Sequence, residues 1–370
     1  MLATAEEDQR AYRIVRMAGR PIIATPARPL GTHLAGLAQY HPVTKKRAWL
    51  RGALRAAAIG GIDRLFTRDC PSPLPPSDDF GFARWLDEIR SALGAPTSLA
   101  TVIWPQLIER KRIYVHLISP SGAPVAFCKV ALDAHNASRL RTELDALTSL
   151  HRWCLKFTRL PRILHHASSA NFHCIAYEPF PTGLVPLKHS WRELAPAIAE
   201  LSGPTRRIDR AELERLDWWR RYLETATRLS REFLRQVDET AARPVAICRV
   251  QGDAAPSNIF RSETGLWICD WEFSSPAGPR RTDELSYYLA ANHYQCLLRP
   301  VAALAACVRR FAPERDRDSI GELAMAMAFL CGRKEPRALK LASRWRWLTS
   351  APAGQPDSRI GRTSAQYRLP

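Results

Sequence analysis

The sequence lacks any run of about 18 to 20 apolar residues, the length that a membrane-spanning helix needs. It also lacks a basic segment leading into an apolar one at its start, because the N-terminus opens with acidic residues. Its nine cysteines include no C-x-x-C pair, and most lie in apolar runs, where a reduced cysteine behaves as a small hydrophobic residue. These absences predict a soluble protein of the reducing cytoplasm.

Acidic residues are too few to balance the basic ones: 54 Lys and Arg residues face 36 Asp and Glu residues, a net charge of +18. Such an excess indicates either an anionic partner or a basic proteome, and composition does not separate the two. The arginines are spread along the whole chain, without zinc-finger spacing or an aromatic RNA-binding signature. We therefore do not expect nucleic acid as a partner.

The order of patterns along the chain predicts an α+β protein in four parts. Residues 96–180 contain short β-rich runs and one amphipathic helix, and they predict a small antiparallel sheet. A Pro/Gly connector at 179–183 ends this lobe, and residues 181–350 predict a mainly helical lobe interrupted by a short β-rich segment. Residues 1–95 predict a helical N-terminal extension, whereas residues 351–370, rich in Gly, Pro, Ser and Arg, predict a flexible tail.

Two helices are expected in the N-terminal extension, at 45–58 and at about 82–93. The first, KKRAWLRGALRAAA, is basic and amphipathic. Its charged face could touch an anionic membrane surface as a peripheral contact, or it could be an ordinary solvated helix face. The sequence leaves both interpretations open.

The chemistry-bearing residues lie in the β-rich segment VQGDAAPSNIFRSETGLWICDWEF, from Val250 to Phe273. Asp253 and Asn258 fall in its first loop, and Asp270 ends the second strand of an expected hairpin closed by a turn at 262–265. Two carboxylates and one amide are thereby brought to one end of a small sheet. The alternative interpretation is that they are turn residues only.

Phosphoryl transfer requires such a trio, because Mg²⁺ must bridge the concentrated negative charge of a polyphosphate while another group orients the attacking hydroxyl. Mg²⁺ prefers oxygen ligands and keeps several waters, so Asp270 and Asn258 suit it as metal ligands. Asp253 would then accept the proton of the acceptor hydroxyl or hold that hydroxyl in line.

This segment resembles the aminoglycoside phosphotransferase and choline kinase superfamily. The superfamily's active-site loop reads roughly H-G-D-x-x-x-x-N, followed by a strand ending in I-D-W-E or I-D-F-E; here the residues are Q-G-D-A-A-P-S-N and I-C-D-W-E. The resemblance extends in layout over about residues 97–348. It implies a bilobal, protein-kinase-like fold that uses ATP and Mg²⁺.

The resemblance also implies a nucleotide site upstream of the motif. Lys129, inside the apolar strand PVAFCKVAL, would bind the α- and β-phosphates and pair with Glu143 on the following helix. The connector from Glu178 to Gly183, which includes Phe180, would be the hinge whose backbone meets the adenine. Apolar side chains such as Ile175 and Ile268 would lie on either side of the ring.

Two departures from the superfamily pattern keep two functions open. Gln251 stands where the superfamily has His, although a Gln amide can also donate and accept hydrogen bonds. Trp104-Pro105 occupies the place of a Gly-rich phosphate loop. One hypothesis is an ATP-dependent phosphotransferase acting on a hydroxyl of a small molecule, sugar or glycan intermediate. Its acceptor could be anionic, because the segment 206–235 is Arg-rich. The other is a pseudokinase that serves as an interaction or scaffold module.

Overall fold

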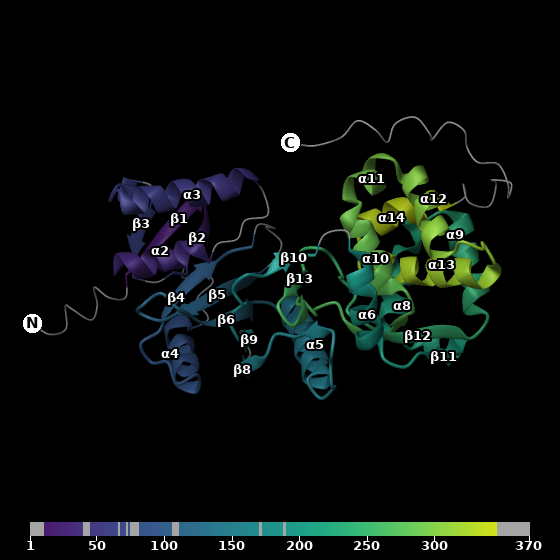
Figure 1. Ribbon diagram of the computed structural model, residues 1–370, viewed down its shortest axis with the longest axis horizontal. Helices are drawn as coiled ribbons and strands as arrows, with labels where there is room; N and C mark the ends of the chain where they lie inside the picture. The colour runs from purple at the N-terminus through teal and green to yellow at the C-terminus, as the bar shows by residue number, and fades with distance from the viewer. Residues whose placement is uncertain are drawn as a thin grey trace, which may run out of the picture. The chain divides into compact units, whose positions relative to one another are not determined.

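The computed structural model describes residues 11–39, 45–65, 67–71, 73–74, 81–105, 111–169, 172–187 and 190–345. The chain forms two compact units (Figure 1). The first comprises Met1–Gly203 with Gln251–Pro276, and the second comprises Pro204–Val250 with Ala277–Pro370. The predicted α+β class, an antiparallel sheet in the first part and helices in the second, is confirmed.

An eight-stranded antiparallel sheet is the framework of the first unit. Its order is β3-β1-β2-β4-β5-β6-β9-β8. The predicted hairpin is β5–β6, and β6 is buried from Ala126 to Ala131, which places Lys129 within an apolar strand. The strands are β1 (Tyr12–Met17), β2 (Arg20–Pro26), β3 (Thr67–Cys70), β4 (Leu99–Ile103), β5 (Arg112–Ile118), β6 (Pro124–Ala131), β8 (Ile163–Ser168) and β9 (His173–Tyr177).

The N-terminal extension contains strands as well as helices. Both expected helices are present, as α3 (Lys45–Ile59) and α4 (Phe82–Ala92), together with α2 (Leu30–Ala38). The prediction of helices alone needs correction, because β1, β2 and β3 extend the sheet beyond β4. Both faces of β1 and β2 are covered, so their apolar residues are consecutive rather than alternating, and the usual strand signal is absent.

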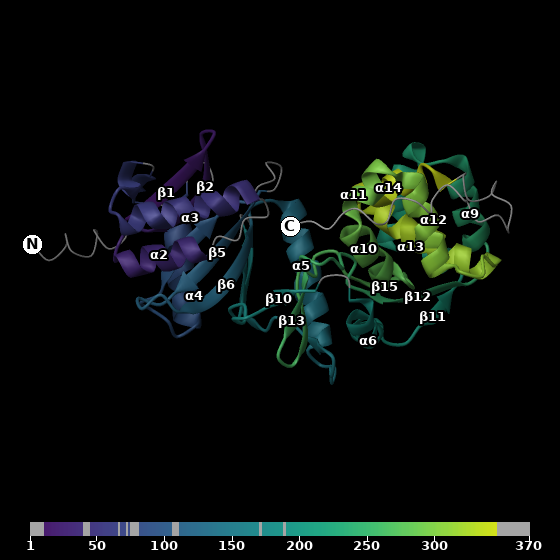
Figure 2. The same cartoon turned by 45° about the horizontal axis from the view of Figure 1, so that its top comes forward.

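The helices of the extension cover both faces of the enlarged sheet (Figures 1 and 2). On one face, Phe82, Trp85 and Ile89 of α4 pack against residues that include Ile14. On the other face, α2 and α3 pack against a group that includes Val15, the next residue of the same strand. This alternation of neighbours shows that the extension is part of the sheet's own core.

A buried polar cluster also connects several elements of the N-terminal extension to one another. The Thr25 hydroxyl lies 2.7 Å from Nδ1 of His33, whose Nε2 is 3.3 Å from the Asp63 carboxylate. The Arg13 guanidinium donates to the same carboxylate. Burial, followed by the charge of Arg13, lowers the pKa of His33. The cluster therefore connects β1, β2 and α2 to the 3₁₀ turn at Asp63–Leu65 around a neutral imidazole.

The division into units follows strand pairing rather than chain order. Residues 251–276 group with the first unit, beyond the lobe boundary predicted at residue 180, because β13 (Ile259–Ser262) and β14 (Gly265–Ile268) pair with β10 (Val185–Pro186) and β7 (Thr158–Arg159). The other elements of this unit are α5 (Ala134–Leu150) and α6 (Trp191–Ser202). The predicted tail, residues 351–370, lies outside the described residues.

The second unit packs its helices around α13 (Arg317–Gly332), which is buried on nearly every side from Leu323 onward. Among the helices that the structure describes, none is both long and apolar enough to cross a membrane. The remaining elements are β11 (Arg206–Ile208), α7 (Arg210–Glu214), α8 (Asp217–Thr225), α9 (Arg231–Ala241), β12 (Val245–Val250), β15 (Ser275–Pro279), α10 (Thr282–Ala291), α11 (His293–Leu298), α12 (Pro300–Phe311) and α14 (Pro336–Ala342).

Two glycines of α2 test how tightly this helix packs on the sheet. A Cβ at Gly36 would contact Thr101 Oγ1 and lie 2.9 Å from Thr25 Cγ2, whereas a Cβ at Gly31 would meet no atom within 4 Å. Gly36→Ala should lower the free energy of unfolding by about 1 to 3 kcal/mol through overpacking. Gly31→Ala should leave it unchanged or raise it by up to about 1 kcal/mol through helix propensity. Urea unfolding of both variants measures this, and a Gly36→Ala protein as stable as the wild type would contradict the close approach.

Candidate active site

A hairpin positions the residues of the sequence motif. β13 and β14 pair from Ile259↔Ile268 to Ser262↔Gly265, as the sequence predicts. Gly265 has φ of +138°, and a Cβ there would lie 2.7 Å from the carbonyl oxygen of Phe157, so only glycine fits this turn. β14 ends at Ile268, two residues before Asp270, which itself takes a left-handed conformation with φ of +63°. The hairpin thereby delivers Asp270 to one end of the small sheet.

Three segments distant in sequence meet at the ammonium group of Lys129. Its Nζ donates to Glu143 Oε1 at 2.9 Å, to Glu143 Oε2 at 2.8 Å and to Asp270 Oδ1 at 2.8 Å. Glu143 lies on α5 and is buried, whereas the Asp270 side chain retains 30% of its exposure. Lys129 therefore connects the large sheet, α5 and the end of the hairpin.

The two carboxylates keep Lys129 protonated. Burial acts to lower the pKa of this ammonium group, but the charges of Asp270 and Glu143 outweigh burial and raise the pKa well above its usual value. Burial is also the largest influence on Glu143 and raises the pKa of its carboxyl group, although Lys129 opposes the rise. Lys129 is thus a fixed positive charge at the edge of the site.

The Gln251 side chain makes hydrogen bonds on both sides of the loop that begins at Gly252. Its side-chain amide donates to the carbonyl oxygens of Cys269 at 3.2 Å and Asp270 at 2.6 Å. Its side-chain oxygen accepts from the backbone N–H of Asp253 at 2.8 Å. A single buried side chain therefore fixes the start of the loop against the backbone of Asp270.

Asn258 connects the two ends of the same loop. Its Nδ2 donates to the backbone oxygen of Asp253 at 3.0 Å and to that residue's carboxylate at 3.1 Å. Its own carbonyl oxygen accepts from the backbone N–H of Cys269 at 3.0 Å. The side-chain oxygen of Asn258 lies 3.1 Å from the Ser257 hydroxyl. The loop thus holds Asp253 and Asn258 side by side, with one amide oxygen directed away from Asp253.

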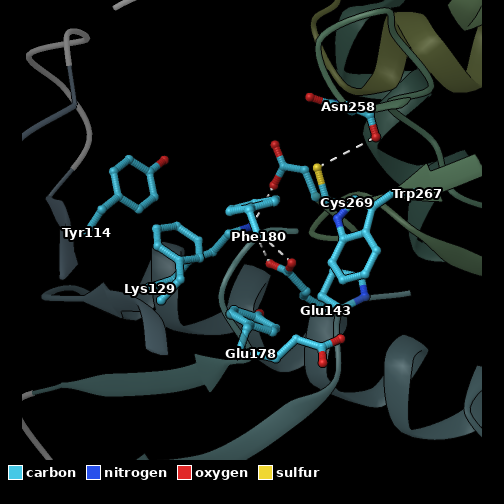
Figure 3. Close-up of a pocket in the computed structure, with 12 residues that line it drawn as sticks. Tyr114, Lys129, Glu143, Glu178, Phe180, Asn258, Trp267 and Cys269 are labelled. Carbon is cyan, nitrogen blue, oxygen red and sulfur yellow. Dashed lines mark hydrogen bonds and ion pairs between the residues drawn. The ribbon is translucent and has the colours of Figure 1, made fainter. Parts of the chain in front are cut away.

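A cavity of about 160 Å³ lies beside these groups, within the first unit (Figure 3). Six of the seven predicted site residues line it: Lys129, Glu143, Glu178, Phe180, Asn258 and Asp270. The seventh, Asp253, does not line it but is hydrogen-bonded to Asn258, which does. The structure therefore gathers the predicted residues at one place and sets Asp253 at its margin.

Aromatic side chains that the sequence analysis missed form much of the remaining lining. Phe127 and Phe180 have ring centroids 5.4 Å apart, and Phe180 and Trp267 have centroids 6.3 Å apart. Tyr114 stacks on Phe127 at 5.8 Å and also packs against the core formed by α2 and α3. Strand periodicity carried the signal, because Phe127 lies two residues before Lys129 and Trp267 two residues before Cys269, another lining residue.

The expectation that Ile175 and Ile268 flank the ring of a ligand needs correction. Both are fully buried and neither lines the cavity. Ile175 pairs with Lys129 across the β6–β9 ladder, and Ile268 pairs with Ile259 in the hairpin. The flat walls come instead from Phe127, Phe180 and Trp267.

The connector after β9 presents backbone groups to this cavity. The Glu178 N–H donates to the carbonyl oxygen of Arg162 at 2.9 Å, and the Glu178 carboxylate accepts from the Arg162 N–H at 3.0 Å. Within the described part of the chain, neither the Glu178 carbonyl oxygen nor the Phe180 N–H has a hydrogen-bond partner. One acceptor and one donor are therefore left for the edge of a heterocycle.

The lining fits a metal-bound polyphosphate nucleotide. Three carboxylates, those of Glu143, Glu178 and Asp270, accompany the single ammonium of Lys129, so the surplus charge is negative and favours a cation. No group of three or more His, Cys, Asp or Glu side chains among the described residues is placed to hold a metal alone. A metal held by Asp270 and Asn258 would therefore complete its coordination with phosphate oxygens and water, as Mg²⁺ commonly does.

No model of a protein family and no curated protein matches the chain. Solved structures do match it. An aminoglycoside-3'-phosphotransferase of type VIII is 16% identical over 72% of this chain and 99% of its own, with a TM-score of 0.39. A protein titled as a candidate fructosamine-3-kinase from Thermobifida fusca YX-ER1 is 17% identical over 71% and 98%, with a TM-score of 0.43. A choline/ethanolamine kinase family protein from Mesorhizobium loti is 15% identical over 70% and 99%, with a TM-score of 0.32.

The resemblance to the aminoglycoside phosphotransferase and choline kinase superfamily rests on the sequence motif of residues 251–272, and these three structures are what the chain is similar to. At these identities and TM-scores the likeness assigns no chemistry, which comes from the residues of the site. The superfamily-type loop is complete except for Gln251, and Gln251 makes a donor contact and an acceptor contact of the kind that a His at this position could make.

Gln251→Ala should loosen the superfamily-type loop, because three hydrogen bonds disappear. We expect the free energy of unfolding to fall by about 1 to 3 kcal/mol and amide exchange at residues 251–258 to accelerate. Gln251→His should retain most of the loop's protection, and Gln295→Ala, at an exposed position, should change neither quantity. Unchanged exchange in Gln251→Ala would show that the loop does not depend on this side chain.

Proposed function

We propose that this protein is an ATP-dependent phosphotransferase that transfers the γ-phosphate to a hydroxyl group of a small molecule. The observation that carries the proposal is the Lys129 ammonium, held by Glu143 and Asp270 in the wall of an aromatic cavity that Asn258 also lines. A fixed cation, two oxygen ligands for a metal and flat apolar walls are what a Mg²⁺-bound nucleotide requires.

Each residue receives a role from its contacts. Lys129 would bind the α- and β-phosphates, and Glu143 would hold Lys129 in position. Asp270 and Asn258 would bind Mg²⁺, and bound Mg²⁺–ATP would supply the phosphoryl group. The adenine would lie against the aromatic wall that includes Phe180 and Trp267, with its polar edge at the backbone of Glu178 and Phe180.

Asp253 would act on the acceptor rather than on the nucleotide. The Asn258 amide donates to its carboxylate, which fixes the direction of that group. A carboxylate held this way can orient an incoming hydroxyl in line with the phosphoryl group and take its proton. The side-chain amide of Asn258 would thus bind the metal through its oxygen and the Asp253 carboxylate through its nitrogen.

A pseudokinase remains the second candidate function, motivated by Gln251 and by Trp104-Pro105 in place of a Gly-rich loop. The hydrogen bonds of Gln251 favour an active loop over a degenerate one. Trp104 and Pro105 follow β4 directly, and residues 106–110 of the expected phosphate-loop region lie outside the described residues. Loss of transfer with retention of partner binding would favour the scaffold.

Thermal unfolding with and without saturating Mg²⁺–ATP tests the nucleotide site. Ligand at ~100 times its dissociation constant should stabilise the wild type by about 2.7 kcal/mol and raise its midpoint by a few degrees. The shift should shrink in Asp270→Asn and persist in Asp145→Asn, a matched change at an exposed position of α5. If the wild type shows no shift, the phosphotransferase proposal fails and the scaffold becomes the better one.

We also propose an anionic acceptor, supported by the net charge of +18. The arginines of residues 206–235 add less support than their number implies, because several already have carboxylate partners. These pairs are Arg206–Glu212, Arg210–Glu214, Arg220–Asp217 and Arg235–Glu239.

Initial rates of ADP formation with different acceptors measure this preference. Phosphorylated or carboxylated sugars should be turned over with kcat/KM at least about tenfold above that of polycationic aminoglycosides, a difference of ~1.4 kcal/mol in transition-state binding. A preference for the aminoglycosides would reverse the proposed charge of the acceptor.

A cytoplasmic location is also proposed. All nine cysteines are free, and six of them are buried. Burial raises the pKa of buried thiols such as Cys307 and Cys331, which keeps them protonated and unreactive. This pattern supports a reducing compartment.

A further inference from the structure

The outer face of α3 is exposed and almost entirely apolar. Over residues 49–59, five positions are exposed, and Arg55 is the only polar residue among them. Trp49 retains 76% of its exposure and Ile59 retains 68%. Gly52 and Ala56 lie between them at helical spacing, so the four residues form one continuous face. A helix face in ordinary contact with water is instead rich in charged and polar residues.

The opposite face of α3 is anchored to the folded core. Leu54 and Ala58 are buried, and they pack in the same cluster as Leu37 of α2 and Ile23 of β2. The two helices lie side by side over these strands (Figure 2). The outer face is therefore exposed although the helix is packed on the core. It is not exposed because the helix is detached.

The charge of α3 indicates what this face meets. The helix sequence KKRAWLRGALRAAAI contains five basic residues and no acidic residue. Arg55 is exposed one turn before Ile59, and Ile62, just beyond the helix, retains 53% of its exposure. An exposed Trp and Ile beside basic side chains are the features of helices that lie in the interface of an anionic bilayer.

Self-association does not fit this surface. A symmetric dimer through α3 would bring the same face of two copies together. Such an interface would contain the exposed Arg55 of both copies, with no acidic residue in either helix to pair with it. An anionic lipid surface, in contrast, matches both the apolar centre and the positive charge.

We propose that α3 docks this protein on membranes that contain anionic lipids, with Trp49 and Ile59 entering the interface and Arg55 contacting the headgroups. The proposal concerns a surface outside the lining of the candidate active site, so it stands apart from the phosphotransferase assignment. Of the two interpretations of this helix in the sequence analysis, a membrane contact or a solvated face, the proposal adopts the first.

Co-sedimentation with phosphatidylcholine vesicles, with and without an equal amount of phosphatidylglycerol, tests the proposal. The full-length protein should bind the mixed vesicles and release as salt is raised, because the headgroup contacts are screened. Trp49→Ala and Arg55→Glu should each weaken binding by about tenfold, through lost interfacial burial and reversed charge. Equal binding to pure phosphatidylcholine, or no binding to either, would overturn the proposal.

Matched variants separate α3 from the charge of the whole protein. Tyr294 retains 77% of its exposure, so Tyr294→Ala controls for loss of an exposed aromatic side chain. Arg309→Glu, at an exposed position of α12, makes the same charge change as Arg55→Glu. If the control variants weaken binding as much as the α3 variants do, α3 is not the docking element. Lipid-free dimerisation that Trp49→Ala abolishes would likewise overturn the proposal in favour of a second copy.

Discussion

The buried ammonium of Lys129 is the constraint on which the site depends. A charge in the interior is tolerated only with partners, and removing one partner of a buried ion pair costs about 3 to 5 kcal/mol. Lys129 has two partners, Glu143 on α5 and Asp270 after β14. The helix and the hairpin must therefore both approach β6, and this approach places Asn258 and the aromatic side chains around one cavity.

A second buried ion pair reinforces the first. Arg112 donates to Glu272 at 2.6 Å, and both side chains are almost completely buried. Arg112 begins β5, the neighbour of β6, and Glu272 lies two residues after Asp270. Between the two carboxylates, Trp271 is fully buried and donates its indole N–H to the carbonyl oxygen of Ile268. The D-W-E sequence is thus fixed to the large sheet at two points and packed between them.

The sequence pointed to most of the polar residues that line the cavity and to few of the aromatic ones. Asp253, Asn258 and Asp270 are close in sequence and differ from their apolar surroundings, so their spacing revealed the loop. Lys129 and Glu143 followed from the resemblance. Phe127 and Trp267 share a strand face with lining residues, but this spacing does not by itself mark a ligand wall, because an aromatic residue in a strand is far more often core. Whether these residues carry out the proposed chemistry stays a prediction.

The fold shows the same contrast. The β5–β6 hairpin could be predicted because a turn separates two apolar runs, and α3 and α4 because of their periodicity. β1 and β2 could not, because helices cover both of their faces and remove the alternation. One of the two partners of β2, strand β4, lies more than seventy residues away in sequence, and local patterns carry no information on such pairings.

Tyr114 contacts both the cavity and the helical extension, since it lines the cavity and packs against the core under α2 and α3. A displacement of those helices would change one wall of the cavity, and a ligand that orders the wall would act on the helices in return. Thermodynamic linkage makes such an effect equal in both directions: whatever free energy the state of the extension adds to ligand binding, the ligand adds to that state. Tyr114 is therefore a contact through which the state of the extension and a ligand in the cavity would act on each other.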